Sequence, residues 1–325
     1  MSNIAIAIPC YNEQATIAKV IEDFRNVFPR APIYVFNNNS TDQSKKIALK
    51  QGAVVYDVRR QGKGYVMQAI FEKIIADILI VVDGDDTYFA KDALKLIQPV
   101  IEEQADMVVG DRLLQADKGS FKRLNYLGNH LINQFVNMVF GTSFRDILSG
   151  YRVFSRRFIE RIPLLTERFE TETEMTLQAL KKGMDIVSLP IQYKSRPAGS
   201  QTKLKPFKDG WCIILAVVIV LRDHYPLRTY GALGFVFIVL SGILNLINFC
   251  VSVSGKTWMW EGHIFGVTLV FIFLGILSLG FGVILNAINT YFQEQEQLVN
   301  RKINKNSVQT KDRDESEDSR ISAVT

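Results

Sequence analysis

Two long segments without any charged side chain lie in the second half of the chain, and they restrict its fold more than any other feature. The segments cover residues 231–253 and 264–292. A helix needs about 20 apolar residues to cross the ~30 Å hydrocarbon layer of a bilayer, and both segments are longer. Helices in the core of a globular protein usually keep one polar face, which is missing here. We therefore expect two transmembrane helices within residues 229–293 rather than two core helices.

The charges around these segments predict how the chain lies across the membrane. Arg222 and Arg228 precede the first segment, whereas Arg301, Lys302 and Lys305 follow the second. Basic residues collect on the cytoplasmic side of membrane proteins. The N-terminus has neither the basic start nor the cleavage site that is typical of a secretory signal. We expect a multi-pass protein of the cell membrane, with its first domain and its C-terminus in the cytoplasm.

The stretches that flank the two segments differ in character. Residues 208–228 contain an apolar run, 211–221, that is too short to span a bilayer and predicts an interfacial helix. Residues 294–325 are rich in Glu, Lys, Asp and Ser, which predicts a disordered cytoplasmic tail. The sequence pI is about 9.0, but basic residues gather just before the membrane, which favours anionic lipid over nucleic acid. The three cysteines are far apart, which fits reduced thiols and no metal cluster.

Short apolar runs alternate with helical stretches over residues 1–110. This β-α-β-α order is typical of a parallel sheet with helices on both faces. The predicted strands are 4–8, 33–36, 53–57, 78–82 and 106–109, and the predicted helices are 14–27, 42–51, 63–75 and 92–103. Farther along, we expect helices at 121–140 and 172–182, and strands at 151–154 and 186–189.

Asp83-Gly84-Asp85-Asp86 directly follows the apolar run 78–82. The carboxyl ends of parallel strands meet at one edge of the sheet, where open α/β folds bind their ligands. Two acidic side chains separated by one residue can share a divalent cation, and that cation can hold a diphosphate. Polar loops also close the first two strands, Pro9-Cys10-Tyr11-Asn12-Glu13 and Asn39-Ser40-Thr41-Asp42, and the second is suited to cap the next helix. We therefore expect three polar loops at one edge.

Together with Arg60-Gln61-Gly62-Lys63-Gly64, these loops resemble the family 2 glycosyltransferases of GT-A fold. Three further motifs are similar to the branch that uses polyprenyl phosphates, which includes dolichol-phosphate mannose synthases and bacterial undecaprenyl-phosphate sugar transferases. These motifs are Gly110-Asp111-Arg112, Asp146-Ile147-Leu148-Ser149-Gly150-Tyr151-Arg152 and Arg196-Pro197-Ala198-Gly199-Ser200-Gln201-Thr202-Lys203-Leu204. The resemblance covers roughly residues 3–210. It implies an α/β, Rossmann-like GT-A catalytic domain with a mostly parallel sheet in residues 1–207.

The resemblance also implies roles for residues at the predicted edge. Asp83 and Asp85 would hold Mg²⁺ or Mn²⁺ against the diphosphate of a nucleotide-sugar. This chain departs from the family pattern at two places. It has Asn37-Asn38-Asn39 where the family often has an acidic residue, so the identity of the nucleotide base stays open. It has Thr87 where the family often has Gln. The donor site would be formed by Pro9, Tyr11, Asn12, Glu13, Asn38, Asp42, Lys63 and Asp83.

The expected chemistry needs positive charge as well as a metal. Breaking the bond between sugar and diphosphate leaves extra negative charge, which a divalent cation stabilises. The nucleophile would be an oxygen of a lipid monophosphate, which is largely ionised near neutral pH because its second pKa is about 6. It therefore needs cations rather than a strong base. The candidates for binding the lipid phosphate are Arg112, Arg196 and Lys203. Arg123 and Arg152 are weaker candidates, since each could equally form a structural ion pair.

The resemblance places Asp146 beside the reacting centre, where Asp85 and Arg112 would act with it in catalysis. We expect Asp146 mainly to orient an arginine or the sugar hydroxyls, with some character of a base; the alternative is a turn cap. The three histidines are scattered, so we expect no histidine catalysis. A single displacement would invert the anomeric configuration.

The sequence thus predicts a metal-dependent inverting glycosyltransferase that moves a hexose from UDP-glucose or UDP-N-acetylglucosamine to undecaprenyl phosphate. The product would serve cell-surface polysaccharide glycosylation, and a separate flippase would move it, since two spans are too few for a translocation path. The alternatives are a GDP-mannose-dependent polyprenyl-phosphate mannose synthase and a non-catalytic nucleotide-sugar-binding scaffold. A processive synthase is disfavoured because its Gln-x-x-Arg-Trp motif is missing. A homo-oligomer is favoured by small residues that allow close helix packing, Gly275, Ser278, Gly280 and Gly282.

Overall fold

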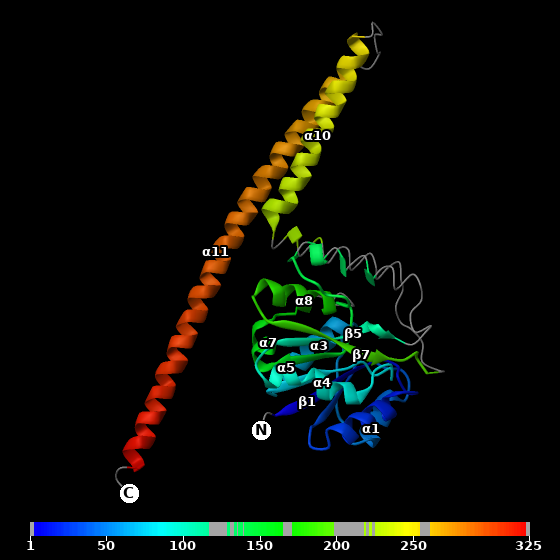
Figure 1. Ribbon diagram of the computed structural model, residues 1–325, viewed down its shortest axis with the longest axis vertical. Helices are drawn as coiled ribbons and strands as arrows, with labels where there is room; N and C mark the ends of the chain where they lie inside the picture. Colours follow the sequence, from blue (N-terminus) through cyan, green and yellow to red (C-terminus); the bar gives the residue numbers. More distant parts are fainter. Residues whose placement is uncertain are drawn as a thin grey trace. The chain divides into compact units, whose positions relative to one another are not determined.

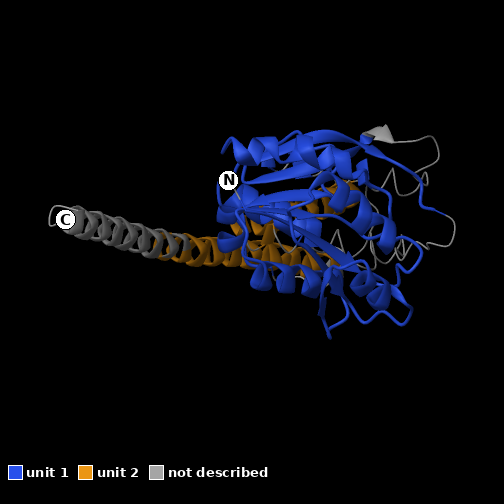
Figure 2. Cartoon of the chain, turned by 90° about the horizontal axis from the view of Figure 1, so that it is seen from below, with its two compact units in different colours: residues 1–218 blue, residues 219–325 orange. Residues whose placement is uncertain are grey.

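The computed structural model describes residues 3–116, 140–164, 171–197, 225–253 and 261–322, together with some residues of 129–138 and 218–222. The chain forms two compact units, residues 1–218 and 219–325, which Figure 2 colours separately. The predicted interfacial helix at 211–221 and the predicted helix 121–140 lie largely outside the described residues.

The described part of unit 1 contains a seven-stranded mixed sheet (Figure 1). The strand order is β3-β2-β1-β4-β6-β5-β7, and all strands run the same way except β6, which is antiparallel to both of its neighbours. The expected mostly parallel α/β sheet is therefore confirmed. The strands are β1 (Ile4–Cys10), β2 (Ile33–Asn37), β3 (Val54–Asp57), β4 (Ile78–Val81), β5 (Met107–Ala116), β6 (Arg152–Ser155) and β7 (Ile186–Tyr193).

Helices cover both faces of this sheet because successive strand residues point into two different cores. In β1, Ile6 and Ile8 belong to one core, whereas Ala5 and Ala7 belong to the other. The first core packs the sheet against α1 and α2, and the second packs it against α3, α7 and α8. The bounds are α1 (Ile17–Val27), α2 (Ser44–Lys50), α3 (Lys63–Lys73), α7 (Arg156–Arg161) and α8 (Thr171–Lys181).

The segment before β5 differs from the single predicted helix 92–103. It consists of three short pieces, η1 (Ala90–Asp92), α4 (Ala93–Leu96) and α5 (Gln98–Ile101). Pro99 explains the interruption, because proline lacks an N–H and its ring clashes with the preceding turn of a helix. The strands predicted at 106–109 and 186–189 are longer than expected, since β5 and β7 pair with each other as far as Ala116 and Tyr193.

The described part of unit 2 consists of two long helices, α10 (Pro226–Val253) and α11 (Glu261–Ser322). Two segments, Pro226–Val253 and Ile264–Phe292, are long and apolar enough to cross a membrane, with mean hydropathy of 2.3 and 2.6. Only 6% and 22% of their most apolar windows are buried, whereas a core helix of a soluble protein is mostly buried. Two candidate membrane helices are present as expected, while their orientation across a membrane stays a prediction.

Small residues let α10 and α11 approach each other closely. A Cβ atom at Gly234 would lie 2.8 Å from the carbonyl oxygen of Gly275. Ser278 donates a hydrogen bond of 2.8 Å to the carbonyl oxygen of Tyr230. Three of the small residues that favoured a homo-oligomer thus pack α11 against α10 of the same chain, Gly275, Ser278 and Gly282. The homo-oligomer itself stays a prediction.

The region after Phe292 also differs from the expectation. Helix α11 continues to Ser322, whereas the sequence predicts a disordered tail. Apolar residues are sparse in the tail, whereas Glu, Gln, Lys and Arg recur in it, and these residues have high helix propensity. Extension of a helix that has already formed adds residues without a new nucleation cost.

Candidate active site

The reversed strand β6 brings an additional loop to the carboxyl edge of the sheet. Val81 of β4 and Val109 of β5 both pair with Arg152, the first residue of β6. Because β6 runs opposite to its neighbours, the loop that enters it lies where β4 ends and beside the part of β5 that follows Val109. The predicted motifs at 83–86, 110–112 and 146–151 are therefore neighbours.

Hydrogen bonds join the loops that follow β1 and β2. The backbone N–H of Asn12 donates to Ser40 Oγ (3.0 Å), and Asn12 Oδ1 accepts from the N–H of Thr41 (2.8 Å). Asp42 Oδ2 accepts from the N–H of Gln14 (3.1 Å). The end of β1 and these two linked loops thus contain most of the residues that were predicted for the donor site, Pro9, Tyr11, Asn12, Glu13 and Asp42.

The amide of Asn38 holds a neighbouring loop in place. Its Nδ2 donates to the carbonyl oxygens of Val58 (3.1 Å) and Arg60 (2.6 Å), and its Oδ1 accepts from the N–H of Gly62 (2.8 Å). Both ends of the amide are thus used within the protein, and the place of Asn38 in the donor site stays a prediction. Asn38 positions Gly62, whose φ of 148° suits glycine, directly before Lys63.

Lys63, the first residue of α3, links two carboxylates. Its Nζ lies 2.6 Å from Asp83 Oδ1 and 2.5 Å from Glu172 Oε1 in the first turn of α8. Burial alone would lower the pKa of Lys63, but the two carboxylates raise it, so the ammonium group stays charged. Glu172 was not among the residues predicted for the site. Its signal in the sequence is the pair Glu172 and Glu174 at the start of a helix with few surface residues.

Three basic side chains act on Asp83, and the backbone of Gly150 lies close to its carboxylate. Burial raises its pKa, but Lys63, Arg112 and Arg196 lower it, and the net shift is downward. A Cβ atom at Gly150 would lie 2.9 Å from the carboxyl carbon of Asp83, a separation that real side chains do not adopt. Glycine at position 150 therefore makes room for this carboxylate, and three cations act on it.

Both oxygens of the buried Asp85 carboxylate are engaged. Oδ2 lies 2.6 Å from Arg196 Nη2 in an ion pair. Oδ1 accepts hydrogen bonds from Thr87 Oγ1 (2.6 Å) and from the Thr87 N–H (3.2 Å), so Thr87 orients the carboxylate. The residue predicted to bind the metal and the residue predicted to bind the lipid phosphate are therefore in direct contact.

Asp83 and Asp85 have the chemistry that a divalent cation requires. Mg²⁺ and Mn²⁺ prefer oxygen ligands, and Mg²⁺ is often held by one or two carboxylates with water and substrate phosphates. Among the described residues, no group of three or more His, Cys, Asp or Glu side chains is suited to a metal. The two carboxylates therefore fit a cation that completes its coordination with phosphate oxygens and water.

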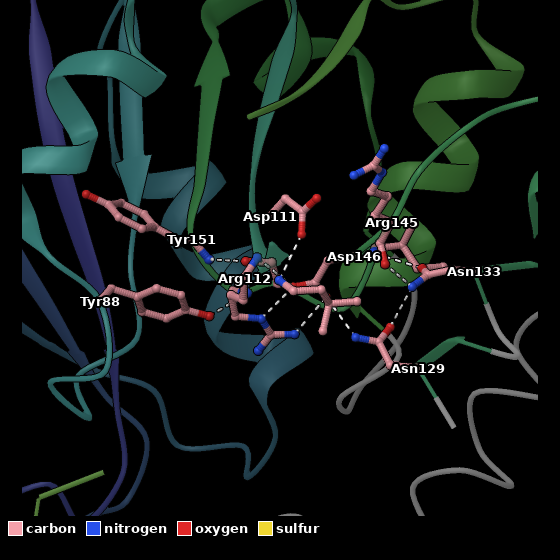
Figure 3. Close-up of polar contacts among 12 residues, drawn as sticks. Tyr88, Asp111, Arg112, Asn129, Asn133, Arg145, Asp146 and Tyr151 are labelled. Atoms are coloured by element: carbon pink, nitrogen blue, oxygen red, sulfur yellow. Dashed lines mark hydrogen bonds and ion pairs between the residues drawn. The ribbon is translucent and has the colours of Figure 1, made fainter. Parts of the chain in front are cut away.

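Asp146 orients Arg112 through a bidentate ion pair (Figure 3). Arg112 Nε and Nη2 donate to Asp146 Oδ2 (2.7 Å) and Oδ1 (2.8 Å). The backbone N–H of Arg112 (3.2 Å) and Asn129 Nδ2 (3.0 Å) donate to the same carboxylate, and Asn133 Nδ2 donates to Asn129 Oδ1 (2.9 Å). Asn129 and Asn133 were not predicted for the site, because an isolated amide in a helical stretch carries no distinctive pattern.

The environment of Asp146 keeps its carboxylate ionised. Burial raises its pKa, but the charge and hydrogen bonds of Arg112, followed by the hydrogen bond from Asn129, lower it below the ordinary value. A carboxylate with a lowered pKa and several donors already in place is a weak base at neutral pH. The contacts are those of an orienting group.

Arg152, a weaker candidate for the lipid phosphate, is a structural residue. It is 1% exposed, and it donates to the carbonyl oxygens of Ile147 (2.6 Å) and Ser149 (2.9 Å) and to Thr176 Oγ1 (3.0 Å). Burial lowers its pKa to about 10, so the group is still charged at neutral pH. Arg152 thus fixes the loop that carries Asp146. The other two candidates, Arg123 and Lys203, lie outside the described residues.

This chain is similar to known proteins in both sequence and fold. Residues 5–163 match the family described as Glycosyl transferase family 2. A Haloferax volcanii protein named Glycosyltransferase AglJ is 39% identical over 233 residues, which are 71% of this chain and 76% of that protein. A dolichyl-phosphate hexose transferase of the same organism is 28% identical over 222 residues, which are 68% of this chain and 95% of that protein.

A solved structure with a similar fold is that of glucosyl-3-phosphoglycerate synthase from Mycobacterium tuberculosis in complex with Mn²⁺, UDP and glucosyl-3-phosphoglycerate. The TM-score is 0.56 at 18% identity, and the match covers 67% of this chain and 80% of that one. This likeness confirms the Rossmann-like GT-A fold that the sequence predicts.

Proposed function

The chain belongs to glycosyl transferase family 2, and on that basis we propose that it transfers a hexose from a nucleotide-sugar to a polyprenyl phosphate. One observation carries the proposal, which is the meeting of five charged side chains at the carboxyl edge of the sheet. Asp83 and Asp85 provide the negative charges, and Lys63, Arg112 and Arg196 provide the positive ones. A reaction between two phosphate-bearing substrates needs both negatively and positively charged side chains.

The donor would bind in the linked loops after β1 and β2, with its diphosphate next to Asp83 and Asp85. These two carboxylates would hold Mg²⁺ or Mn²⁺, which would stabilise the charge on the departing diphosphate. Lys63 would contact the same diphosphate, since its ammonium group is held beside Asp83. We infer that UDP-glucose or UDP-N-acetylglucosamine is the donor. The M. tuberculosis synthase of similar fold binds Mn²⁺ and UDP, which supports this inference.

The acceptor phosphate would bind to Arg112 and Arg196. Asp146 would hold Arg112 in one orientation, so that the guanidinium presents a fixed positive charge to a phosphate oxygen. An acceptor that arrives ionised needs no deprotonation, which suits an Asp146 that already accepts several hydrogen bonds. A direct attack on the anomeric carbon would then invert its configuration.

A polyprenyl acceptor is supported by the two apolar helices and by the relatives. Pro226–Val253 and Ile264–Phe292 would hold the protein in the cell membrane as a multi-pass chain, with unit 1 and the C-terminus in the cytoplasm. One relative is named for a dolichyl-phosphate acceptor. We infer that undecaprenyl phosphate is the acceptor here, that the product donates sugar to a surface polysaccharide, and that a separate flippase moves it across the membrane.

The test is a reconstituted reaction of the full chain in detergent. Undecaprenyl phosphate and Mn²⁺ or Mg²⁺ are combined with UDP-glucose, UDP-N-acetylglucosamine or GDP-mannose, and the lipid-linked sugar is measured by mass spectrometry. Asp85→Asn should lower turnover at least about 100-fold, because metal stabilisation of transition-state charge amounts to several kcal/mol. Asp23→Asn, which removes an exposed carboxylate paired with Lys19, is the matched control and should retain turnover. The absence of product with every donor would refute the proposed function.

A further inference from the structure

The metal-binding oxygen of Asp85 already has a cationic partner. Oδ1 is held by both donors of Thr87, and Oδ2 lies 2.6 Å from Arg196 Nη2. The Asp85 side chain is only 5% exposed, so a divalent cation cannot reach Oδ2 from an open side while the guanidinium stays in contact. Binding of the cation to Oδ2 therefore requires that Arg196 leave it.

Asp83 differs from Asp85 in what happens to its cationic partner when a metal binds. Its partner Lys63 also contacts Glu172, so Lys63 keeps a buried carboxylate when a cation takes Asp83. Lys63 is therefore fixed in place with or without the metal. The side chain of Arg196 is twice as exposed as that of Lys63, at 30% against 15%.

From these contacts we propose that Arg196 and the divalent cation exchange on Asp85, and that the released guanidinium then binds the monophosphate of the acceptor. This inference rests on the proposed function, because it assumes both the metal and the phosphate acceptor. While the cation is absent, Arg196 neutralises Asp85 and is unavailable to the acceptor. Arrival of the cation with the donor makes Arg196 available, so donor binding favours acceptor binding.

The backbone around Arg196 is fixed well enough to confine the exchange to its side chain. The N–H of Lys194 donates to the carbonyl oxygen of Thr87 (3.1 Å), and Tyr193 forms a β-bridge with Tyr88. Lys194 Nζ also lies 2.7 Å from Asp86 Oδ1. These contacts anchor the end of β7 to the loop that carries Asp85, so the guanidinium can move while its main chain stays.

The exchange gives thermodynamic coupling between two ligands. If the cation raises the affinity for the acceptor phosphate, the acceptor phosphate must raise the affinity for the cation by the same factor. The acceptor would then bind weakly to a protein that has no donor, and each turnover would begin with the metal-bound nucleotide-sugar.

The first experiment measures Mn²⁺ binding to the full chain in detergent, without nucleotide, by electron paramagnetic resonance. Arg196→Gln removes the competitor and should tighten Mn²⁺ binding about tenfold, because a hydrogen bond to a charged group contributes about 1.5–3 kcal/mol. Lys194→Gln is the matched control, since it removes the same charge from the adjacent Asp86. It should tighten Mn²⁺ binding only about twofold, through a partly screened charge. Unfolding of a variant cannot mimic tighter binding.

The second experiment measures binding of farnesyl phosphate with and without Mn²⁺. Mn²⁺ should strengthen this binding in the wild type, and Arg196→Gln should remove most of that gain. UDP affinity at saturating Mn²⁺ should be the same in both proteins, since a loss there would assign the guanidinium to the donor and overturn the acceptor role.

The outcomes distinguish a failure of the proposed exchange from a failure of the proposed transferase function. Equal Mn²⁺ affinity in the wild type and Arg196→Gln, or equal tightening in Lys194→Gln, would overturn the exchange while leaving the transferase proposal intact. A wild-type protein that binds no Mn²⁺ and yet transfers sugar would overturn the metal site and, with it, the exchange.

Discussion

The buried ion pair between Arg112 and Asp146 gives the sharpest prediction. Substitution of Asp146 by Asn keeps the shape of the side chain but removes the negative charge that faces the guanidinium. The side chain of Asp146 is 0% exposed and that of Arg112 is 13% exposed, so water cannot replace the lost partner. Asp146→Asn should therefore lower the stability of unit 1 and release Arg112 from its orientation.

The size of the effect follows from this burial. Breaking a buried ion pair by removing one partner costs about 3–5 kcal/mol, because it leaves an uncompensated charge. Since an amide oxygen can still accept one hydrogen bond, the low end, about 3 kcal/mol, is expected here. For a unit of this size, that loss corresponds to a decrease in Tm of about 6–12 °C.

Thermal unfolding of the full chain in detergent, followed by circular dichroism, measures this change. Glu160→Gln is the control, since it removes a carboxylate from the exposed pair with Arg156 and should cost less than about 1 kcal/mol. The double variant Arg112→Gln/Asp146→Asn should recover part of the loss, because no unpaired charge remains. A decrease in Tm for Asp146→Asn as small as that for Glu160→Gln would refute the reasoning.

Three further predictions follow from contacts of the described residues. The folded-state pKa of Asp146 is lowered, so the unfolded chain takes up the proton first; this stabilisation is complete above the unfolded pKa of about 3.9 and is lost as the pH falls through the lower folded pKa. Urea titrations should show the loss in the wild type and its absence in Asp146→Asn, and a rise in stability on acidification would contradict the sign. Gly150→Ala should displace the Asp83 carboxylate, weaken Mn²⁺ binding and lower turnover, while far-ultraviolet circular dichroism stays unchanged; wild-type Mn²⁺ affinity would contradict it. Gly275→Val should separate α10 from α11 and lower the Tm, whereas Gly280→Val, with open space around it, should not; equal shifts would refute the close packing.

The order of elements in residues 1–110 could be read from the sequence because its strands are buried on both faces. Such strands are continuous apolar runs, and the runs at 4–8, 33–36 and 78–82 match β1, β2 and β4 to within two residues. The reversal of β6 could not be predicted, because no local pattern tells whether a short apolar run pairs in parallel or antiparallel. This reversal places the loop of Asp146 in the site.

Within the site, local motifs could be found and long-range partners could not. The acidic pair Asp83 and Asp85 stands out because it directly follows a strand. The contact between Lys63 and Glu172 joins residues that are far apart in the sequence, and no spacing rule connects them. The resemblance placed Asn38 in the donor site, but no sequence pattern revealed that its amide also binds backbone groups of the neighbouring loop.

The buried Arg152 makes the reactive edge depend on residues that no substrate would touch. Its guanidinium extends from the carbonyl groups of Ile147 and Ser149 to Thr176 in α8 and Met107 in β5. A larger or smaller side chain at Thr176 or Met107 would shift the main chain on which Asp146 is mounted. Laboratory selection for a new sugar donor therefore has targets in the layer beneath the catalytic surface as well as on it.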